Sequence, residues 1–280
     1  MKTSTTAIEK WIESHPYLQE VGALPFAIAK ELENAELIVK LPDLDSVLDK
    51  FNEGIPLLET DIDFNLNKIA SDLLIKLGNL AKVDDLPAQV RESAEKLSKL
   101  DNKKSESLVN SVIKGDKETL EKEISSLEIE QDIMLYFIWS SIRMAFNNVT
   151  DELEDWIYEK NWKKTVCPVC GSHPVMSLLK RTKRGRERFL HCDHCGTNWG
   201  TKRIGCPYCD NIDQKTLSVK DTEDEPDIRL DLCHKCNKYI KTYIGTDKES
   251  AGISDWASIH LDLLMKDSGF KKKAGLIKLG

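Results

Sequence analysis

The chain lacks long apolar segments and the short motifs that commonly mark a catalytic site. Its longest apolar run of consequence, Met134–Trp139, is far shorter than the ~20 residues that cross a bilayer, so we interpret it as buried core. There is no phosphate-binding loop, no GxGxxG after a strand, no HExxH and no GxSxG. We therefore expect a protein that has no membrane span and is not an enzyme.

Cysteine is absent before residue 167 and after residue 236, and all eight cysteines between these limits lie in Cys-x-x-Cys pairs. Each pair places two sulfurs at the tip of one tight turn, and two turns supply the four ligands of a tetrahedral metal site. The simplest assignment is sequential, although an interleaved pairing of the turns also satisfies the spacing. The sequential assignment predicts two sites: Cys167, Cys170, Cys192 and Cys195 in site 1, and Cys206, Cys209, Cys233 and Cys236 in site 2.

The residue that follows each second cysteine supports this interpretation. These residues are Gly171, Gly196, Asp210 and Asn237, and glycine, asparagine and aspartate are the types that best accept the positive φ of a metal-binding turn. A disulfide framework fits less well, because it is typical of exported proteins and the N-terminal residues carry no export signal. A thioredoxin-like redox site fits less well too, because it needs a single Cys-x-x-Cys pair and this chain has four. We expect free thiols in a reducing cytoplasm.

Four thiolates close the coordination shell of an ion and leave no open position for water. Such a site is structural if it holds zinc, or carries one electron if it holds iron, and four-sulfur geometry alone does not choose between the two metals. Four histidines lie beside the cysteines, and we expect them to surround the sites rather than to ligate the ions, because eight sulfurs fill both shells: His173, His191, His194 and His234.

Charge divides the chain into two parts. Residues 1–160 carry a net charge of −14 and residues 161–280 a net charge of +7. The first part has helical periodicity, whereas residues 175–180 and 239–243 alternate in the manner of strands. We predict an α+β protein with a helical domain at 1–160 and a double metal-knuckle domain at 161–280, in which two rubredoxin-like or zinc-ribbon β modules precede a C-terminal helix.

Several helices can be placed from their apolar spacing. One face of a helix runs from Leu66 to Leu80, and Glu128–Asn147 is apolar nearly all round, as expected for the central helix of a bundle. Asp101–Ser107 is polar enough to suggest a solvated loop, and Gly54–Leu58 suggests a rigid loop that packs on the bundle. A final helix is expected at 253–268, with Trp256, Ile259, His260, Leu263 and Leu264 on its apolar face. Shorter helices are expected at 5–14, 25–40, 43–51, 86–100, 105–113 and 116–125.

Six basic residues flank Gly185 and suggest a charged hairpin: Lys180, Arg181, Lys183, Arg184, Arg186 and Arg188. A hairpin of this kind is usually a solvated face, but it also suits an acidic partner or phosphate. Nucleic acid is the weaker hypothesis, because no aromatic residue is interleaved for base stacking.

Longer strings around the cysteines resemble the formate dehydrogenase accessory protein FdhE family. The similarity lies in Cys167–Val175, Leu190–Trp199, Cys206–Cys209 and Cys233–Lys241, in the C-terminal segment Asp255–Leu264, and more loosely in Gly54–Leu58. The string that runs from His191 to Trp199 and the final helix are the most specific parts.

The resemblance implies a helical domain followed by two rubredoxin-like knuckles, and a cytoplasmic factor that is not an enzyme. It implies binding to the catalytic subunit of formate dehydrogenase, a respiratory and often exported molybdenum or tungsten enzyme, before that subunit is used or exported. Trp199, Arg184, Arg186 and His191 are the candidate partner contacts. An iron electron carrier and a nucleic-acid-binding zinc ribbon are the alternative functions.

Overall fold

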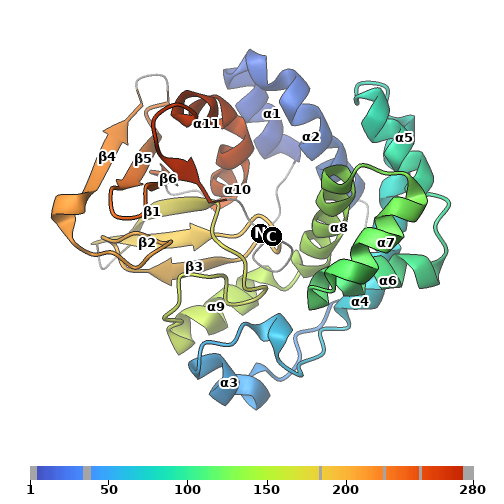
Figure 1. The fold of residues 1–280 in the computed structure, drawn as a ribbon, viewed down its shortest axis with the longest axis horizontal. Helices are drawn as coiled ribbons and strands as arrows, with labels where there is room; N and C mark the ends of the chain where they lie inside the picture. Colours follow the sequence, from blue (N-terminus) through green and yellow to red (C-terminus); the bar gives the residue numbers. More distant parts are fainter. Residues whose placement is uncertain (1–4, 34–38, 183–184, 223–224, 246–247, 274–280) are drawn as a thin grey trace. The chain divides into compact units, whose positions relative to one another are not determined.

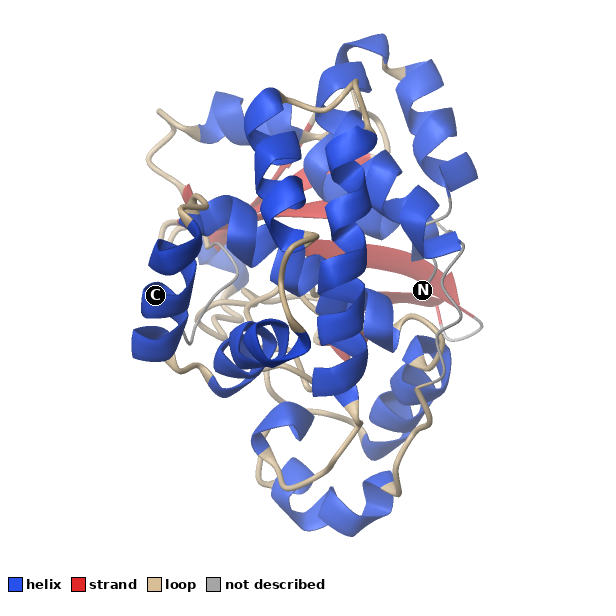
Figure 2. Ribbon diagram, turned by 90° about the vertical axis from the view of Figure 1, so that its right-hand side faces the viewer, coloured by secondary structure: helices blue, strands red, loops and turns tan. Residues whose placement is uncertain are grey.

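A computed structural model describes residues 5–33, 39–182, 185–222, 225–245 and 248–273, and these form two compact units (Figure 1). The helical unit takes residues up to 46 and residues 61–150. The sheet unit takes residues 47–60 and the described residues from 151 to 273. Strands occur only in the sheet unit among the described residues (Figure 2). The expected α+β class, with N-terminal helices and a cysteine-bearing β region, is confirmed.

The helical unit is organised around α8 (Gln131–Phe146), which is buried along most of its length, as its all-round apolar sequence predicts. Helix α4 (Leu66–Lys76) packs against both α8 and α6 through the apolar face that the spacing predicts. In the part of the chain that the structure describes, no helix is long and apolar enough to cross a membrane. The other α-helices of this unit are α1 (Thr5–Ser14), α2 (Gln19–Glu33), α5 (Ala88–Leu97), α6 (Asn102–Lys114) and α7 (Lys117–Leu127).

The expectation of a solvated loop at Asp101–Ser107 is wrong, because helix α6 begins there. Asp101 is the N-cap of α6, and its carboxylate accepts a hydrogen bond from the backbone N–H of Lys104 at 2.7 Å. The side chain thus satisfies one of the backbone donors that a helix leaves unpaired at its start. The polarity of this segment marks a helix beginning.

The sheet unit contains one seven-stranded sheet in which the strand order is β3-β2-β1-β6-β5-β4. Each cysteine module supplies an antiparallel three-stranded meander, and the two meanders join where β1 pairs with β6 in parallel. A short β7 adds to β6 in parallel. The strands are β1 (Met176–Thr182), β2 (Gly185–His191), β3 (Asn198–Thr201), β4 (Leu217–Asp221), β5 (Ile228–Cys233), β6 (Lys238–Tyr243) and β7 (Lys271–Lys272).

Two segments from outside the cysteine region belong to the sheet unit. Phe51 of α3 (Leu48–Asn52) packs its ring against Trp156 of α9 (Thr150–Lys160) and against Trp162, at centroid distances of 4.7 and 4.6 Å. The boundary at residue 160 stays a prediction. By spatial compactness, residues 47–60 and 151–160 group with the sheet unit, and the aromatic contacts join these two segments to each other.

The loop at Gly54–Leu58 was expected to pack on the helical bundle, but it groups with the sheet unit. The backbone N–H groups of Leu57 and Leu58 donate to the carbonyls of Pro168 and Val169, at 2.8 and 2.9 Å. These carbonyls belong to the first Cys-x-x-Cys turn, so the loop supports that turn from outside. Short 3-10 helices occur here and at four other places: Pro16–Leu18, Leu44–Val47, Leu57–Glu59, Leu77–Lys82 and Gln214–Thr216.

The expected C-terminal helix is two helices, α10 (Lys248–Ala257) and α11 (Ile259–Met265), separated at Ser258. The predicted apolar face is wrong for α11, because Ile259, Leu263 and Leu264 are exposed. Met265 instead packs with Leu230 and Tyr239 of the sheet. The break at Ser258 changes which side chains α11 turns toward the sheet.

Candidate metal centres and their surroundings

Three of the four Cys-x-x-Cys turns share one backbone pattern. The first cysteine donates its N–H to the carbonyl five residues later, and its own carbonyl accepts from the N–H four residues later, as in Cys167 with Ser172 and Gly171 at 2.8 and 3.0 Å. The same pair of bonds occurs at Cys192 and Cys206. The residues after the second cysteines all have positive φ, which confirms that expectation: Gly171 (76°), Gly196 (79°), Asp210 (56°) and Asn237 (52°).

The structure brings the sulfurs together in the sequential pairing. The Sγ atoms of Cys167 and Cys195 are 3.5 Å apart, and those of Cys170 and Cys192 are 3.4 Å apart. In the second set, Cys206 and Cys236 are separated by 3.6 Å and Cys209 and Cys233 by 3.8 Å. Each set lies within 4.8 Å and could hold a metal ion.

These separations fit a metal rather than a disulfide. A disulfide requires about 2.05 Å between sulfurs. Four sulfurs placed tetrahedrally at about 2.3 Å from one zinc ion lie about 3.8 Å from each other. The shortest separation, 3.4 Å, is close to this edge length, so both sets need only small adjustments to enclose one ion of this size.

The two sets differ in exposure. All four cysteines of the first set are buried, whereas Cys209 and Cys236 of the second set are half-buried. Burial raises the pKa of the Cys167 and Cys192 thiols well above the usual value, because a buried thiolate loses its hydration. A divalent cation would supply the charge that makes such thiolates stable.

Hydrogen-bond donors lie close to two sulfurs of the second set. The Asn211 amide lies 3.6 Å from the Cys233 sulfur, and the Tyr208 N–H lies 3.4 Å from the Cys206 sulfur. Burial raises the pKa of the Cys233 thiol, but the backbone N–H of Cys236 and the Asn211 amide outweigh it and bring this pKa to about 7. Donors placed in this way favour the thiolate form.

The histidines support their neighbours rather than complete a separate shell. His194 Nδ1 lies 2.6 Å from Ser172 Oγ, which links the first two turns. His194 also lies within 4.8 Å of Cys192 and Asp193, but this group shares Cys192 with the first four-sulfur set. Burial and two lysines lower the pKa of His173 to about 4, so this ring is neutral near pH 7.

The candidate partner contacts fall into different environments. Trp199 is 1% exposed and His191 is 2% exposed, so neither offers its side chain to a partner in this structure. His191 Nδ1 is 2.9 Å from Asn198 Oδ1, and Asn198 donates twice to Glu154 of α9 at 2.8 Å. His191 and Asn198 thus link β2 and β3 to each other and to α9. Arg186 is exposed, and Arg184 lies outside the described residues.

The sequence places Arg188 with the basic hairpin, but the structure buries it between the two modules. Its Nε donates to Ser177 of β1 at 2.7 Å, and one terminal nitrogen donates to the Gly205 carbonyl at 2.7 Å. The other donates to Asp231 of β5 at 2.9 Å. Burial lowers the pKa of the guanidinium and Asp231 opposes that shift. This one side chain joins the first meander, the segment between modules and the second meander.

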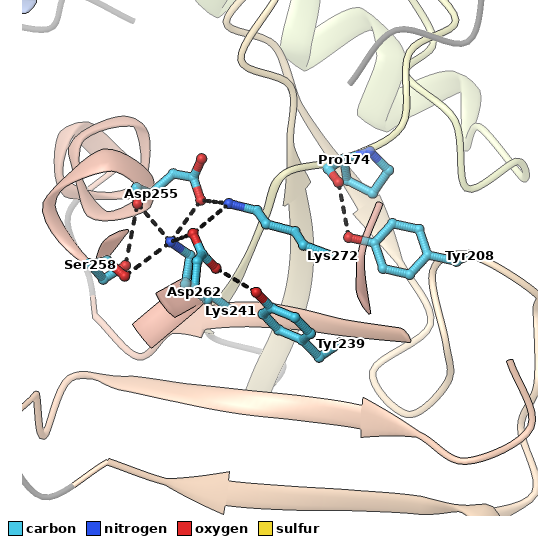
Figure 3. Close-up of polar contacts among 8 residues, drawn as sticks. All are labelled: Pro174, Tyr208, Tyr239, Lys241, Asp255, Ser258, Asp262 and Lys272. Carbon is cyan, nitrogen blue, oxygen red and sulfur yellow. Dashed lines mark hydrogen bonds and ion pairs between the residues drawn. The ribbon is translucent and has the colours of Figure 1, made fainter. Parts of the chain in front are cut away.

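A second buried cation, Lys241 of β6, holds α10 and α11 to the sheet (Figure 3). Its Nζ lies 2.7 Å from an Asp262 carboxylate oxygen and 3.1 Å from an Asp255 carboxylate oxygen. It also donates to the carbonyls of Asp255 and Ser258, at 2.7 and 3.3 Å. Sequence reasoning missed this group, although Asp255 and Asp262 lie seven residues apart, a spacing that would place both on one face of the continuous helix expected there.

Two tyrosines and Lys272 complete this region (Figure 3). Lys272 of β7 contacts both carboxylates of the Lys241 group, and Tyr239 donates its hydroxyl to Asp262 at 2.8 Å. Tyr208, in the third Cys-x-x-Cys turn, donates its hydroxyl to the Pro174 carbonyl at 3.2 Å. This last bond connects the two cysteine modules a second time.

The chain matches two protein-family models. The model described as "FdhE, central domain" matches residues 166–203, and the one described as "FdhE, C-terminal domain" matches residues 190–278. A "Protein FdhE homolog" of Aquifex aeolicus is 27% identical over 271 residues, which cover 94% of this chain and 88% of that protein. One of Haemophilus ducreyi is 30% identical over 136 residues, and the match spans less than half of that relative (44%).

Among solved structures, the crystal structure of the FdhE protein from Pseudomonas aeruginosa has the same fold. The TM-score is 0.65 at 19% sequence identity, and the match covers 97% of this chain and 93% of that one.

Proposed function

This chain belongs to the FdhE family, and we propose that it is a cytoplasmic accessory factor for formate dehydrogenase. In this proposal it binds the catalytic subunit of that enzyme and supports its assembly or activation before use or export. The supporting observation is the position of the family matches, which together cover the part of the sheet unit that carries both four-cysteine sets.

We propose further that each four-cysteine set holds one zinc or iron ion with all four thiolates. A closed shell does not activate water, so the ions would stabilise the fold or carry an electron rather than catalyse hydrolysis. The chain would therefore act by presenting a surface, not by transforming a substrate. The hydrogen bonds of Arg188 and Tyr208 between the two modules suit this role, because they keep that surface rigid.

Co-purification tests the binding step. A tagged catalytic subunit of formate dehydrogenase, expressed with this chain under anaerobic conditions, should retain the chain on the resin. The same tag on an unrelated molybdenum enzyme is the control. Equal recovery with both baits would contradict a specific partner, and metal analysis of the recovered chain would identify zinc or iron at about two ions per chain if both sets are filled.

Gene removal tests the maturation step. Cells without this chain should keep the formate dehydrogenase polypeptide but lose its activity, whereas a molybdenum enzyme that does not bind the chain should keep its activity. Unchanged formate dehydrogenase activity would refute the role in maturation.

A further inference from the structure

Two hollows adjoin each other on the sheet unit, beside the second four-cysteine set. The apolar pocket, of about 300 Å³, is lined by the third Cys-x-x-Cys turn and by β4, β5 and β6. The basic groove, of about 750 Å³, is lined by α9, β2, β3 and the residues that follow each of α9 and β3. Arg188 and Arg203 line both hollows, so the two lie side by side on one surface.

The apolar pocket has the features of a site for one apolar side chain. Apolar residues from the knuckle and the strands form its walls, among them Pro207, Leu217 and Ile240. Ile204 and Val219 line the pocket while remaining half exposed, at 50% and 52%. Exposed branched side chains beside a hollow of this volume are typical of a contact surface rather than of a solvated strand.

The charges around both hollows favour an anionic ligand. The basic groove has six lysine and arginine side chains against three carboxylates. The pocket's one carboxylate, Asp231, already accepts from Arg188 and Thr242 and pairs with Arg229 at 2.9 Å. A ligand carboxylate near either hollow therefore meets an excess of cations.

We propose that this surface binds an extended peptide segment of the partner, with one apolar side chain in the apolar pocket and acidic residues along the basic groove. The proposal rests on the function proposed above, since it specifies which chemistry of the client the chain recognises. The apolar side chain supplies contact area, and the carboxylates set direction and register. Arg186, exposed on β2, contributes to the groove.

The binding test uses synthetic peptides and the full chain with its metals. A fluorescein-labelled peptide of about eight residues spans about 27 Å when extended. One version carries a central leucine among glutamates and aspartates, a second has serine in place of leucine, and a third has lysines in place of the acids. Fluorescence anisotropy should show the first version binding at least about tenfold more tightly than either of the others.

Two variants and their matched controls locate the site. Ile204→Glu should weaken binding about tenfold or more, whereas Ile212→Glu should leave it unchanged, because Ile212 is 62% exposed but lies outside both hollows. Lys202→Glu in the groove is compared in the same way with Lys220→Glu, an exposed lysine of β4 outside both hollows. Equal affinity of all four variants would overturn the proposal.

A labelled single-stranded oligonucleotide serves as the competing probe. Binding of the oligonucleotide that Lys202→Glu abolishes and Ile204→Glu does not, with no peptide binding, would overturn the peptide proposal in favour of nucleic acid. Peptide binding that depends on both residues supports it.

Capture by the tagged catalytic subunit separates this proposal from the proposed function. If the wild-type chain is captured and Ile204→Glu is lost while Ile212→Glu is kept, both stand. If the wild type and both isoleucine variants are captured equally, the docking surface is refuted and the accessory role stands. If the wild type is not captured but still discriminates between the peptides, the accessory role fails and the docking surface stands.

Discussion

Replacing Arg188 with methionine should destabilise the sheet unit strongly. The side chain is 3% exposed, and its three hydrogen bonds reach Ser177, Gly205 and Asp231 on three separate segments. Methionine keeps much of the apolar volume of the arginine stem and removes the charge and all three donors. The change therefore isolates the polar contribution of the contact between modules.

The magnitude follows from what the substitution leaves behind. Removing one partner of a buried ion pair costs about 3–5 kcal/mol, because the remaining charge is uncompensated. Asp231 still has Arg229 at 2.9 Å and the Thr242 hydroxyl at 2.8 Å, so we expect the lower end, about 3 kcal/mol. With a denaturant dependence of about 1–3 kcal/mol per molar, the urea midpoint should fall by about 1 M or more.

Urea unfolding of the metal-loaded protein, followed by circular dichroism and by metal release, measures this loss. Arg186→Met is the matched control, because Arg186 lies on the same strand but is exposed, and its midpoint should stay near that of the wild type. The double variant Arg188→Met, Asp231→Leu should be less destabilised than Arg188→Met alone, since no carboxylate is left with a missing partner. An Arg188→Met midpoint equal to that of Arg186→Met would refute the reasoning.

Three further predictions concern the cysteine turns and the helices. A chelator should remove metal in two phases, and the faster phase should come from the second set, because two of its cysteines are half-buried. Cys209→Ser should abolish the fast phase, and a single phase for the wild type would contradict this prediction. Burial raises the pKa of Asp255, but the attraction of Lys241 and Lys272 outweighs burial, so the pKa of this carboxyl lies below its usual value. Its stabilisation is then present above about pH 4 and lost as the pH falls through the folded pKa, so the urea midpoints of wild type and Asp255→Asn should differ by a constant amount above about pH 5 and converge only below about pH 4. Gly171→Ala should unfold at lower urea than Gly185→Ala, with a free energy of unfolding lower by up to about 1 kcal/mol. Both glycines have positive φ, but only at Gly171 would the new Cβ meet neighbours: Glu59 Oε1 at 2.8 Å, which can move aside, and the Pro56 ring at 3.2 Å, which gives way less readily. Equal midpoints would remove the steric argument.

Much of the helical unit is predictable because its helices are amphipathic over several turns. The bounds of α1 match the expectation, and α8 is the buried helix that its composition predicts. The errors come from capping and from breaks. Asp101 begins a helix that polarity alone suggests is a loop, and Ser258 divides a helix whose spacing looks continuous. Helix α9 was missed as an element, although Leu153, Trp156 and Ile157 recur at helical spacing within it.

The candidate metal centres were predictable in composition but not in their surroundings. The spacing of the cysteines and the turn-forming residue after each pair depend on a few consecutive residues, so they can be read directly from the chain. The roles of Arg188 and Lys241 cannot, because an exposed and a buried cation have the same local sequence signature. Their burial depends on carboxylates more than ten residues away along the chain, which only folding brings within about 3 Å.

By itself the sequence determined four Cys-x-x-Cys turns, the helical character of the first half and a two-part charge distribution, because each is a property of local spacing or of composition. The tertiary structure decided which turns meet, since each three-stranded meander brings its own two Cys-x-x-Cys turns together. It also decided which basic residues stay at the surface. Desolvating a charge is costly, so Arg188 and Lys241 are buried only where carbonyls and carboxylates from distant segments converge on them.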